Sequence, residues 1–232
     1  MSAIADNLQR VQQKIQHCAE ESDRDTDKIQ LIAVSKTRSL DEVQSVVALN
    51  QYSFGENTIQ DAMTKIPNVN QNEIEWHFIG HLQSKKAGKI PGYFQWIHSV
   101  DSIKLAQKLS TAMFNYSKNA VLNCLIQVNV SGEDSKSGLA PEDVKSYLQQ
   151  VLDLNLPCLQ WRGLMTIGVN GDEQQTRQAF AQLKTLQQTC QREFDLNDFD
   201  QLSMGMSNDY CVAIEEGATL VRVGTAIFGE RS

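Results

Sequence analysis

The sequence lacks the features of a secreted, membrane-bound or modular protein. Its 232 residues include only four prolines, and no stretch rich in proline, glycine or serine divides them. No run approaches the roughly 18 apolar residues needed to cross a membrane. Residues 1–22 carry polar and charged side chains throughout, so neither a secretory signal nor a transit peptide is evident. These absences predict a single cytoplasmic domain spanning 1–232.

Positive charge and paired cysteines are also scarce. Lysine and arginine number 21 against 28 acidic residues, giving a net charge of −7. Such a surface repels polyphosphate, so we expect no nucleic-acid partner. The cysteines are odd in number and form no CxxC pair, which predicts reduced thiols in a reducing compartment. They are Cys18, Cys124, Cys158, Cys190 and Cys211.

Apolar residues recur with two different periods. Residues 4–18 place a stripe of apolar side chains at spacings of three and four, which predicts an amphipathic helix. Eight short apolar runs typical of strands follow, and helical patterns separate several of them. The runs are 31–36, 52–57, 75–80, 96–101, 122–130, 159–167, 201–207 and 220–229.

This alternation predicts an α/β fold, a single (β/α)8 TIM barrel with an extra N-terminal helix. Ser39 and Glu42 form a capping-box pattern that marks the start of the helix after the first strand. A doubly wound open sheet is the alternative arrangement of the same elements. In a barrel, the binding residues lie where the strands end.

Lys36 ends the first apolar run, LIAVSK. An ammonium group in the barrel mouth would lose hydration, which lowers its proton affinity and favours the neutral amine that a Schiff base requires. The simpler interpretation is a solvent-exposed lysine, or one paired with Glu56 or Asp101.

The segments around strands seven and eight predict a phosphate site, which barrels commonly build there. Ser207 supplies a hydroxyl group, and Asn208 and Asp209 begin a predicted helix whose first N–H groups suit an anion. Gly224 allows close backbone approach, and Thr225 adds a hydroxyl donor. Alone, each is also explained by an ordinary helix cap or turn.

Three further features need an interpretation. Arg222 shares a strand face with Gly224, so it should point into the barrel and bind a ring nitrogen or a carboxylate. His77 and His81 are four residues apart, but a strand running into a loop and the lack of a third ligand favour structural roles and no metal site. We interpret a basic cluster on the helix predicted after the third strand as a solvent-exposed helix face: Lys85, Lys86 and Lys89.

Seven segments together resemble the YggS- and PROSC-type pyridoxal phosphate homeostasis proteins, in order and spacing, from about residue 32 to 229. One departure is Lys85, where the family commonly has asparagine. The segments are AVSK (33–36), FGEN (54–57), WHFIGHLQ (76–83), SKSG (135–138), RGLM (162–165), LSMGMSND (202–209) and VRVGTAIFG (221–229).

The resemblance implies the N-terminal barrel of bacterial alanine racemases and pyridoxal 5'-phosphate as cofactor. It implies that Lys36 holds the cofactor as a Schiff base and that Arg222 faces the pyridine nitrogen. Three residues match positions that hold the phosphate, and one matches a residue lining the cofactor pocket. These are Ser207, Gly224 and Thr225 for the phosphate, and Asn57 for the pocket.

The function implied is a carrier or buffer of the cofactor, important for vitamin B6 and amino-acid homeostasis, with no catalytic residues and without robust turnover. Apo enzymes that use the cofactor are the expected partners, and the chain is expected to be a monomer or weak dimer. The alternative is a small amino-acid racemase in which Tyr210 or Cys211 donates a proton, although a two-base racemase needs a second acid/base group facing the lysine. A cofactor-free Schiff-base aldolase is the third reading.

Overall fold

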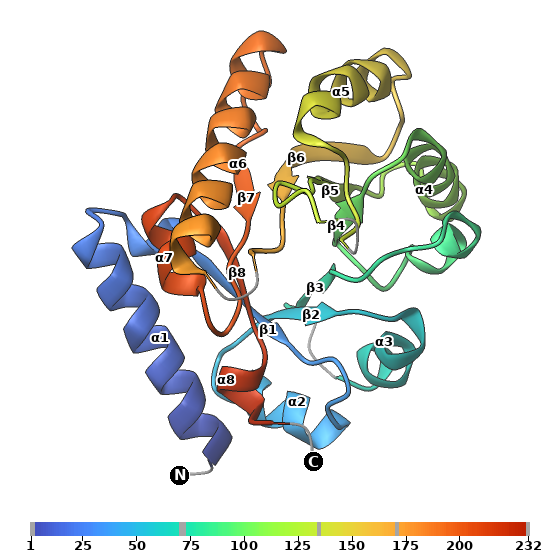
Figure 1. Ribbon diagram of the computed structural model, residues 1–232. Coiled ribbons are helices and arrows are strands. Elements are labelled where there is room, and N and C mark those ends of the chain that lie inside the picture. The colour runs from blue at the N-terminus through green and yellow to red at the C-terminus, as the bar shows by residue number, and fades with distance from the viewer. Residues whose placement is uncertain (1–2, 70–72, 134–135, 170–171, 231–232) are drawn as a thin grey trace.

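The computed structural model describes residues 3–69, 73–133, 136–169 and 172–230. In these ranges eight parallel strands form a closed barrel in chain order, with β1 paired to both β2 and β8. Figure 1 shows the strands at the centre and helices around them. The strands are β1 (Gln30–Val34), β2 (Ser53–Glu56), β3 (Glu75–Phe78), β4 (Trp96–Val100), β5 (Leu122–Gln127), β6 (Leu159–Met165), β7 (Gln201–Ser203) and β8 (Leu220–Val223).

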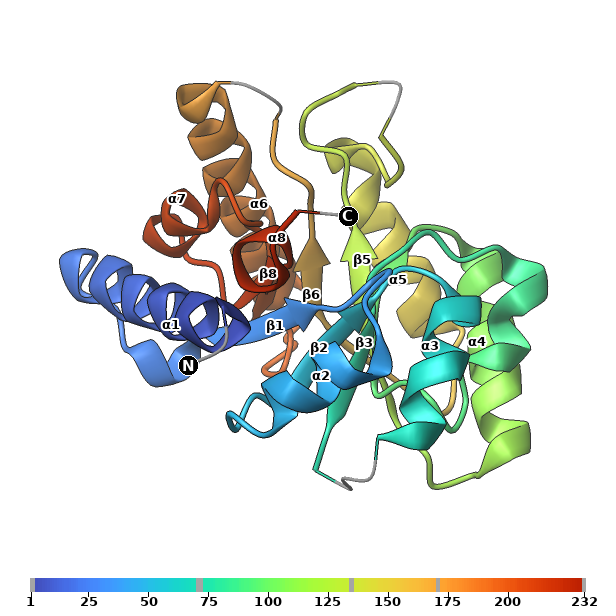
Figure 2. The ribbon, with the colours of Figure 1, turned by 90° about the horizontal axis from the view of Figure 1, so that it is seen from below.

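The closed barrel confirms the predicted (β/α)8 fold over the open sheet, and each of the eight predicted runs contains a strand. The strands are shorter than the runs because their last residues turn away at the barrel rim. β8 ends at Val223, and residues 225–228 of the same apolar run form a short helix. Figure 2, a side view, shows the parallel arrows of β5 and β6 pointing toward the same rim.

Helices surround the barrel. The predicted N-terminal helix forms α1 and buries the predicted stripe, including Leu8, Val11 and Ile15. At α2 the Ser39 side chain accepts from Glu42 N–H and the Glu42 carboxylate accepts from Ser39 N–H, so the predicted capping box forms. The helices are α1 (Ala3–Glu21), α2 (Leu40–Val47), α3 (Ile59–Lys65), α4 (Ile103–Tyr116), α5 (Val144–Asp153), α6 (Glu173–Glu193), α7 (Tyr210–Glu215) and α8 (Thr225–Phe228).

Short 3-10 helices join some of these elements: η1 (Thr26–Lys28), η2 (Ile66–Asn68), η3 (Ser84–Lys89) and η4 (Pro141–Asp143). The basic cluster of Lys85, Lys86 and Lys89 lies on η3, so the helix predicted after β3 is a 3-10 helix. No helix in the described ranges is long and apolar enough to cross a membrane.

The core has two parts of very different composition. A large apolar layer lies between the strands and the surrounding helices. Inside the barrel a small apolar cluster is buried: Ile32, Trp96, Leu125, Met165 and Leu220. Because strand residues alternate between faces, the inward positions of β3, β4, β7 and β8 also place polar side chains in the interior. Among them are His77, His98, Ser203 and Arg222, all buried.

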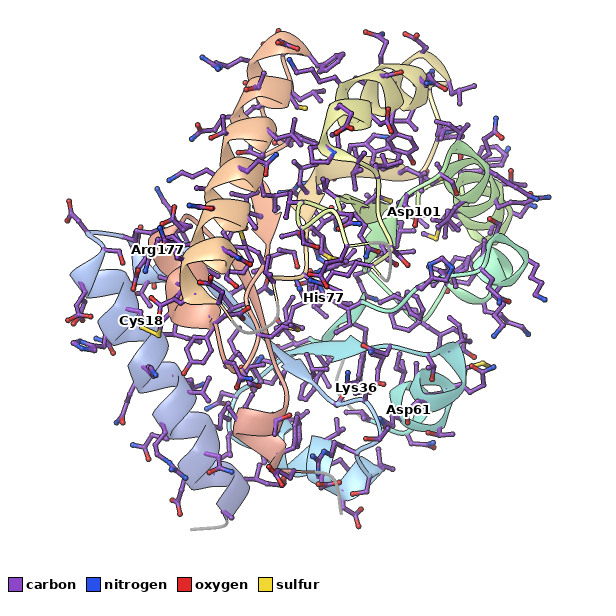
Figure 3. The ribbon with its side chains drawn as sticks, in the orientation of Figure 1. Cys18, Lys36, Asp61, His77, Asp101 and Arg177 are labelled. Carbon is purple, nitrogen blue, oxygen red and sulfur yellow. A yellow bond between two sulfur atoms is a disulfide. The ribbon has the colours of Figure 1, made fainter. Side chains whose placement is uncertain are left out.

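A disulfide joins Cys18 on α1 to Cys211 on α7, with their Cα atoms 5.6 Å apart (Figure 3). This corrects the prediction that all five cysteines are reduced thiols. The two residues are 193 positions apart, so no local spacing pattern reveals the pair. Cys124, Cys158 and Cys190 are free. Arg177 on α6 also binds α7, through Glu215 at 2.6 Å and Glu216 at 3.0 Å.

Reduction of this disulfide should destabilise the fold. Closing a loop of this length lowers the entropy of the unfolded chain and typically stabilises by about 2 to 5 kcal/mol. We therefore expect the melting temperature to fall when dithiothreitol is added, and to be low in Cys211→Ser with or without reductant. Cys158→Ser is the matched control and should respond to reductant as the wild type does. An unchanged wild-type melting temperature would show that the thiols are not bonded.

Candidate functional site

A cavity of about 600 Å³ opens at the C-terminal ends of the strands. Its walls come from the segments that follow β1, β2, β3, β6, β7 and β8, elements far apart in the sequence. All six residues predicted to form the cofactor site line it: Lys36, Asn57, Ser207, Arg222, Gly224 and Thr225. The structure therefore brings the candidate amine, the buried guanidinium and both candidate phosphate segments into one pocket.

Lys36 lies in a turn just after β1, half-buried, and not within the strand as the sequence predicted. The turn is fixed from both sides. Lys65 Nζ donates to Ser35 O at 2.6 Å, and Asp61 Oδ2 accepts from Thr37 N–H at 2.6 Å. Figure 3 labels Lys36 and Asp61 at this corner of the barrel.

Glu56 completes this anchor beneath the lysine turn. Its Oε1 accepts from Ser35 Oγ at 2.6 Å and from Lys65 Nζ at 2.8 Å. The carboxyl group is fully buried, and its Oε2 has no hydrogen-bond partner among the described residues. Burial raises the pKa of Glu56 to about 7, against the opposing effect of Lys65 and Ser35. Lys65 forms the ion pair with this carboxylate, at 2.8 Å.

Asp101, the other suggested partner of Lys36, lies elsewhere on the rim. Figure 3 shows the two residues well apart. Asn57 follows β2 and comes very close to Gly80, the second residue after β3. A Cβ atom on Gly80 would lie 2.0 Å from Asn57 O, so only glycine allows the two backbones to approach this closely.

The two candidate phosphate segments contact each other. Ala226 N–H donates to Ser207 Oγ at 3.3 Å, which joins the loop after β7 to the start of α8. The predicted helix from Asn208 starts only at Tyr210 and is six residues long, while Asp209 Oδ1 accepts from Met206 N–H at 2.6 Å and closes a turn. In the described ranges, the N–H groups of Ser207, Asn208 and Thr225 donate to no protein acceptor.

Glycines let these loops pack tightly. Gly205 has φ of +91°, and a Cβ atom there would lie 2.6 Å from Ala213 Cβ on α7. At Gly224 a Cβ atom would lie 3.2 Å from Val34 O at the end of β1. Gly224 thus brings the loop after β8 against the strand that precedes Lys36.

Arg222 points into the barrel, as its strand face predicted, and forms part of the pocket. Its side chain is almost completely buried and donates to Ser203 Oγ at 2.5 Å and Thr166 O at 2.8 Å. Burial lowers the pKa of Arg222 to about 10, an effect that the Asp209 carboxylate opposes. The guanidinium therefore stays charged at neutral pH and can only donate hydrogen bonds.

Other candidates lie outside the pocket. His77 is buried in the barrel interior while His81 is exposed, and the described residues contain no cluster of three or more potential metal ligands. Cys211 is in the disulfide, and the Tyr210 ring lies 5.9 Å from Lys14 Nζ of α1. Neither lines the pocket. Within the SKSG segment, Ser135 lies outside the described residues.

Comparison with known proteins identifies the family. The sequence model of the alanine racemase N-terminal domain family matches residues 1–232. The chain is 41% identical to the pyridoxal phosphate homeostasis protein of Pasteurella multocida, over 98% of this chain and 97% of that protein. It is 44% identical to the protein of the same name from Pseudomonas aeruginosa, over 100% and 97% respectively. This chain belongs to the pyridoxal phosphate homeostasis protein family.

Solved structures agree with this assignment. PipY of Synechococcus elongatus, solved with PLP bound, has a TM-score of 0.83 and 35% identity, over 97% of this chain and 100% of that one. An alanine racemase from Corynebacterium glutamicum has a TM-score of 0.71 with 16% identity, over 99% of this chain and 61% of that one. At that identity the second likeness concerns the barrel fold alone.

Sequence reasoning missed the anchor of the lysine turn in this chain. Lys65 is 2% exposed, yet a lysine in the last turn of α3 gives no signal that distinguishes it from a surface residue. Glu56 belongs to the FGEN segment, which carried the family resemblance but did not indicate a role for this carboxylate. Only the packing of α3 against β2 places the two side chains together.

The pH dependence of stability tests the state of Glu56. The unfolded carboxyl group titrates near 4.5 and the folded one near 7, so its stabilising contribution is complete below pH 4.5 and is lost as the pH rises through 7. Glu56→Gln removes this loss. From pH 5 to 8, we expect the free energy of unfolding of the variant to rise relative to wild type, by up to about 3 kcal/mol.

Urea unfolding at several pH values measures this difference, and the same change at exposed Glu73 serves as the matched control. A constant difference between Glu56→Gln and wild type from pH 5 to 8 would mean that Glu56 is ionised throughout this range.

Proposed function

We propose that this protein binds pyridoxal 5'-phosphate in the rim pocket and carries or buffers it, for vitamin B6 and amino-acid homeostasis, without robust catalytic turnover. The observation that carries the proposal is the convergence in one cavity of a lysine amine, a buried guanidinium and unpaired backbone N–H groups. The relative with PLP bound, PipY, supports the same ligand.

The loops after β7 and β8 suit the phosphate. A phosphate dianion accepts hydrogen bonds only, and the N–H groups of Ser207, Asn208 and Thr225 lack protein acceptors in the described ranges. The hydroxyl groups of Ser207 and Thr225 add two donors, and both residues line the cavity. This set of neutral donors can hold the dianion without a lysine or arginine on these loops.

Arg222 suits the aromatic ring. Its guanidinium only donates, so it pairs with a ring nitrogen that accepts, which is the unprotonated pyridine form. Ser203 and Thr166 use two of its five donors, and the pocket lies on its remaining side. Asn57 lines the same wall beyond β2.

Lys36 supplies the covalent link. When bound, the ligand provides an aldehyde that condenses reversibly with a neutral primary amine, forming a C=N bond and releasing one water molecule. The anchors at Ser35 and Thr37 hold the lysine turn at the pocket wall before the ligand arrives. The link is reversible, as a carrier requires.

The groups around the pocket favour a carrier over a racemase. A two-base racemase needs a second acid/base group on the opposite face of the ring from the lysine. Among the described residues that line the cavity there is no tyrosine, cysteine or histidine. Tyr210 and Cys211, the donors considered from the sequence, face α1 instead.

The role of a carrier implies a location and partners for this protein. A cytoplasmic protein of this kind would give up the ligand to apo enzymes that need it, acting as a monomer or weak dimer. In a reducing cytoplasm the Cys18–Cys211 bond would open. Transfer to an apo enzyme is measurable as recovery of that enzyme's activity faster than release into solution allows.

Spectroscopy and trapping test the Lys36 assignment. With pyridoxal phosphate added, we expect an absorbance band of the lysine adduct that borohydride fixes on the peptide containing Lys36. Lys36→Ala should lack the band, and Lys145→Ala, at a half-exposed lysine on α5, should keep it. Labelling spread over several lysines would contradict the site, and a protein without any band would favour the cofactor-free aldolase.

Exchange of the α-hydrogen tests the absence of turnover. The loaded protein is incubated with L-alanine or D-alanine in D₂O, and deuterium at the α carbon is followed by NMR. We expect exchange no faster than with free pyridoxal phosphate, because the described residues that line the pocket include no tyrosine, cysteine or histidine to act as the second base. Faster exchange that disappears in Lys36→Ala would establish a racemase-like enzyme instead.

A further inference from the structure

A line of hydrogen-bonded side chains crosses the barrel interior beneath the pocket. Glu75 Oε2 lies 3.1 Å from His77 Nε2, and His77 Nδ1 lies 3.0 Å from His98 Nε2. His98 Nδ1 lies 2.8 Å from Ser203 Oγ, which accepts from Arg222 Nη1 at 2.5 Å. The line begins at the half-buried first residue of β3 and ends at the pocket (Figure 3 labels His77 at the centre of the barrel).

The two ends of the line fix the direction of every hydrogen bond in it. Arg222 can only donate, so Ser203 Oγ accepts from it and gives its own proton to His98 Nδ1. His98 therefore carries its proton on Nε2 and donates to His77 Nδ1. His77 in turn carries its proton on Nε2 and donates to Glu75.

Glu75 is held as a carboxylate at the far end. Besides His77, it accepts from Trp96 Nε1 at 2.6 Å and from Gln30 Nε2 at 2.8 Å. Burial raises the pKa of Glu75, but these hydrogen bonds and His77 outweigh it and lower the pKa to about 2. Burial also lowers the pKa of both histidines, so the line holds two neutral rings between one negative and one positive charge.

The alternative arrangement of protons leaves a donor without its acceptor inside the line. A proton added to His77 at Nδ1 would face the Nε2–H of His98. Moving the His98 proton to Nδ1 would remove this clash but would point that N–H at Ser203 Oγ. Ser203 already accepts from Arg222, and its own hydroxyl proton would then lose His98 as its acceptor. Both rings are fully buried, so water cannot repair the mismatch.

We propose that Glu75, His77, His98 and Ser203 are positioning residues for Arg222, holding its guanidinium toward the ring nitrogen of the bound ligand from the opposite end of the barrel. The proposal rests on the proposed function for the identity of the ligand, but the hydrogen-bond line itself belongs to the protein alone. Glu75 supplies the negative charge at the far end of the line. The two histidines and Ser203 carry the same hydrogen-bond direction across the interior to Arg222.

The first experiment uses the protein without ligand. In ¹⁵N spectra of histidine and arginine side chains at pH 7.5, we expect His77 and His98 as neutral Nε2–H tautomers with slowly exchanging N–H protons. Glu75→Gln should shift the signals of His98 and Arg222 as well as His77, because an amide cannot accept from all three donors. Glu73→Gln, a neighbouring exposed carboxylate, should shift none of them.

Either a protonated or Nδ1–H ring, or a Glu75→Gln effect confined to His77, would overturn the proposal. Should Glu75→Gln fail to fold, Ser203→Ala breaks the line beside Arg222 and should shift the signals of both Arg222 and His98. Unchanged Arg222 signals in that variant would overturn the proposal equally.

The second experiment measures binding of pyridoxal 5'-phosphate and of its 1-deaza analogue, in which carbon replaces the ring nitrogen. In Glu75→Gln or Ser203→Ala we expect affinity for the first to fall about tenfold, the order of one charge-assisted hydrogen bond, and affinity for the analogue to stay unchanged. An equal fall for both would indicate a merely structural role and overturn the proposal. If wild type binds neither compound, the proposed function fails, while the ligand-free spectra still decide the hydrogen-bond line.

Discussion

The pairing of β8 with β1 is the constraint on which the site depends. The two strands lie near opposite ends of the chain, yet Ala33 pairs with Val223, so the segments carrying Lys36 and Gly224 leave the barrel side by side. A closed barrel has no free edge, and a slip of one residue would reverse the faces of β8 and point Arg222 away from the pocket. Closure in this register therefore places the amine and the guanidinium together.

Stability and function fall in different layers of this barrel. The continuous apolar core lies between strands and helices, whereas in the described interior a cluster of five apolar residues lies among buried polar ones. Buried ionic groups rarely increase stability, because their desolvation costs about as much as their pairing returns. The Lys65–Glu56 pair and the line from Glu75 to Arg222 are therefore best explained by the side chains that they hold at the rim.

The sequence was sufficient to predict elements that bury one face and residues that end a strand. The spacing of apolar residues located the eight strands and α1, and the alternation of side chains along a strand predicted that Arg222 points inward. The rest needed contacts across the chain. Cys18 and Cys211 are 193 residues apart, and Lys65 looks like any lysine at the end of a helix. His98 drew no attention in the sequence, and its pairing with His77 depends on the register of β3 with β4.

The Lys36 turn on one side of the pocket is more rigidly held than the loop after β7 on the other side. The turn of Lys36 is fixed by buried bonds from Lys65 and Glu56, where solvent cannot compete. The loop after β7 depends on α7, which is held by a disulfide to α1 and by ion pairs of the partly exposed Arg177. Exposed ion pairs contribute little, so with the disulfide open the loop loses its strongest tie. The amine then stays preorganised while the phosphate donors gain freedom, which suits a protein that must both take up and give up its ligand.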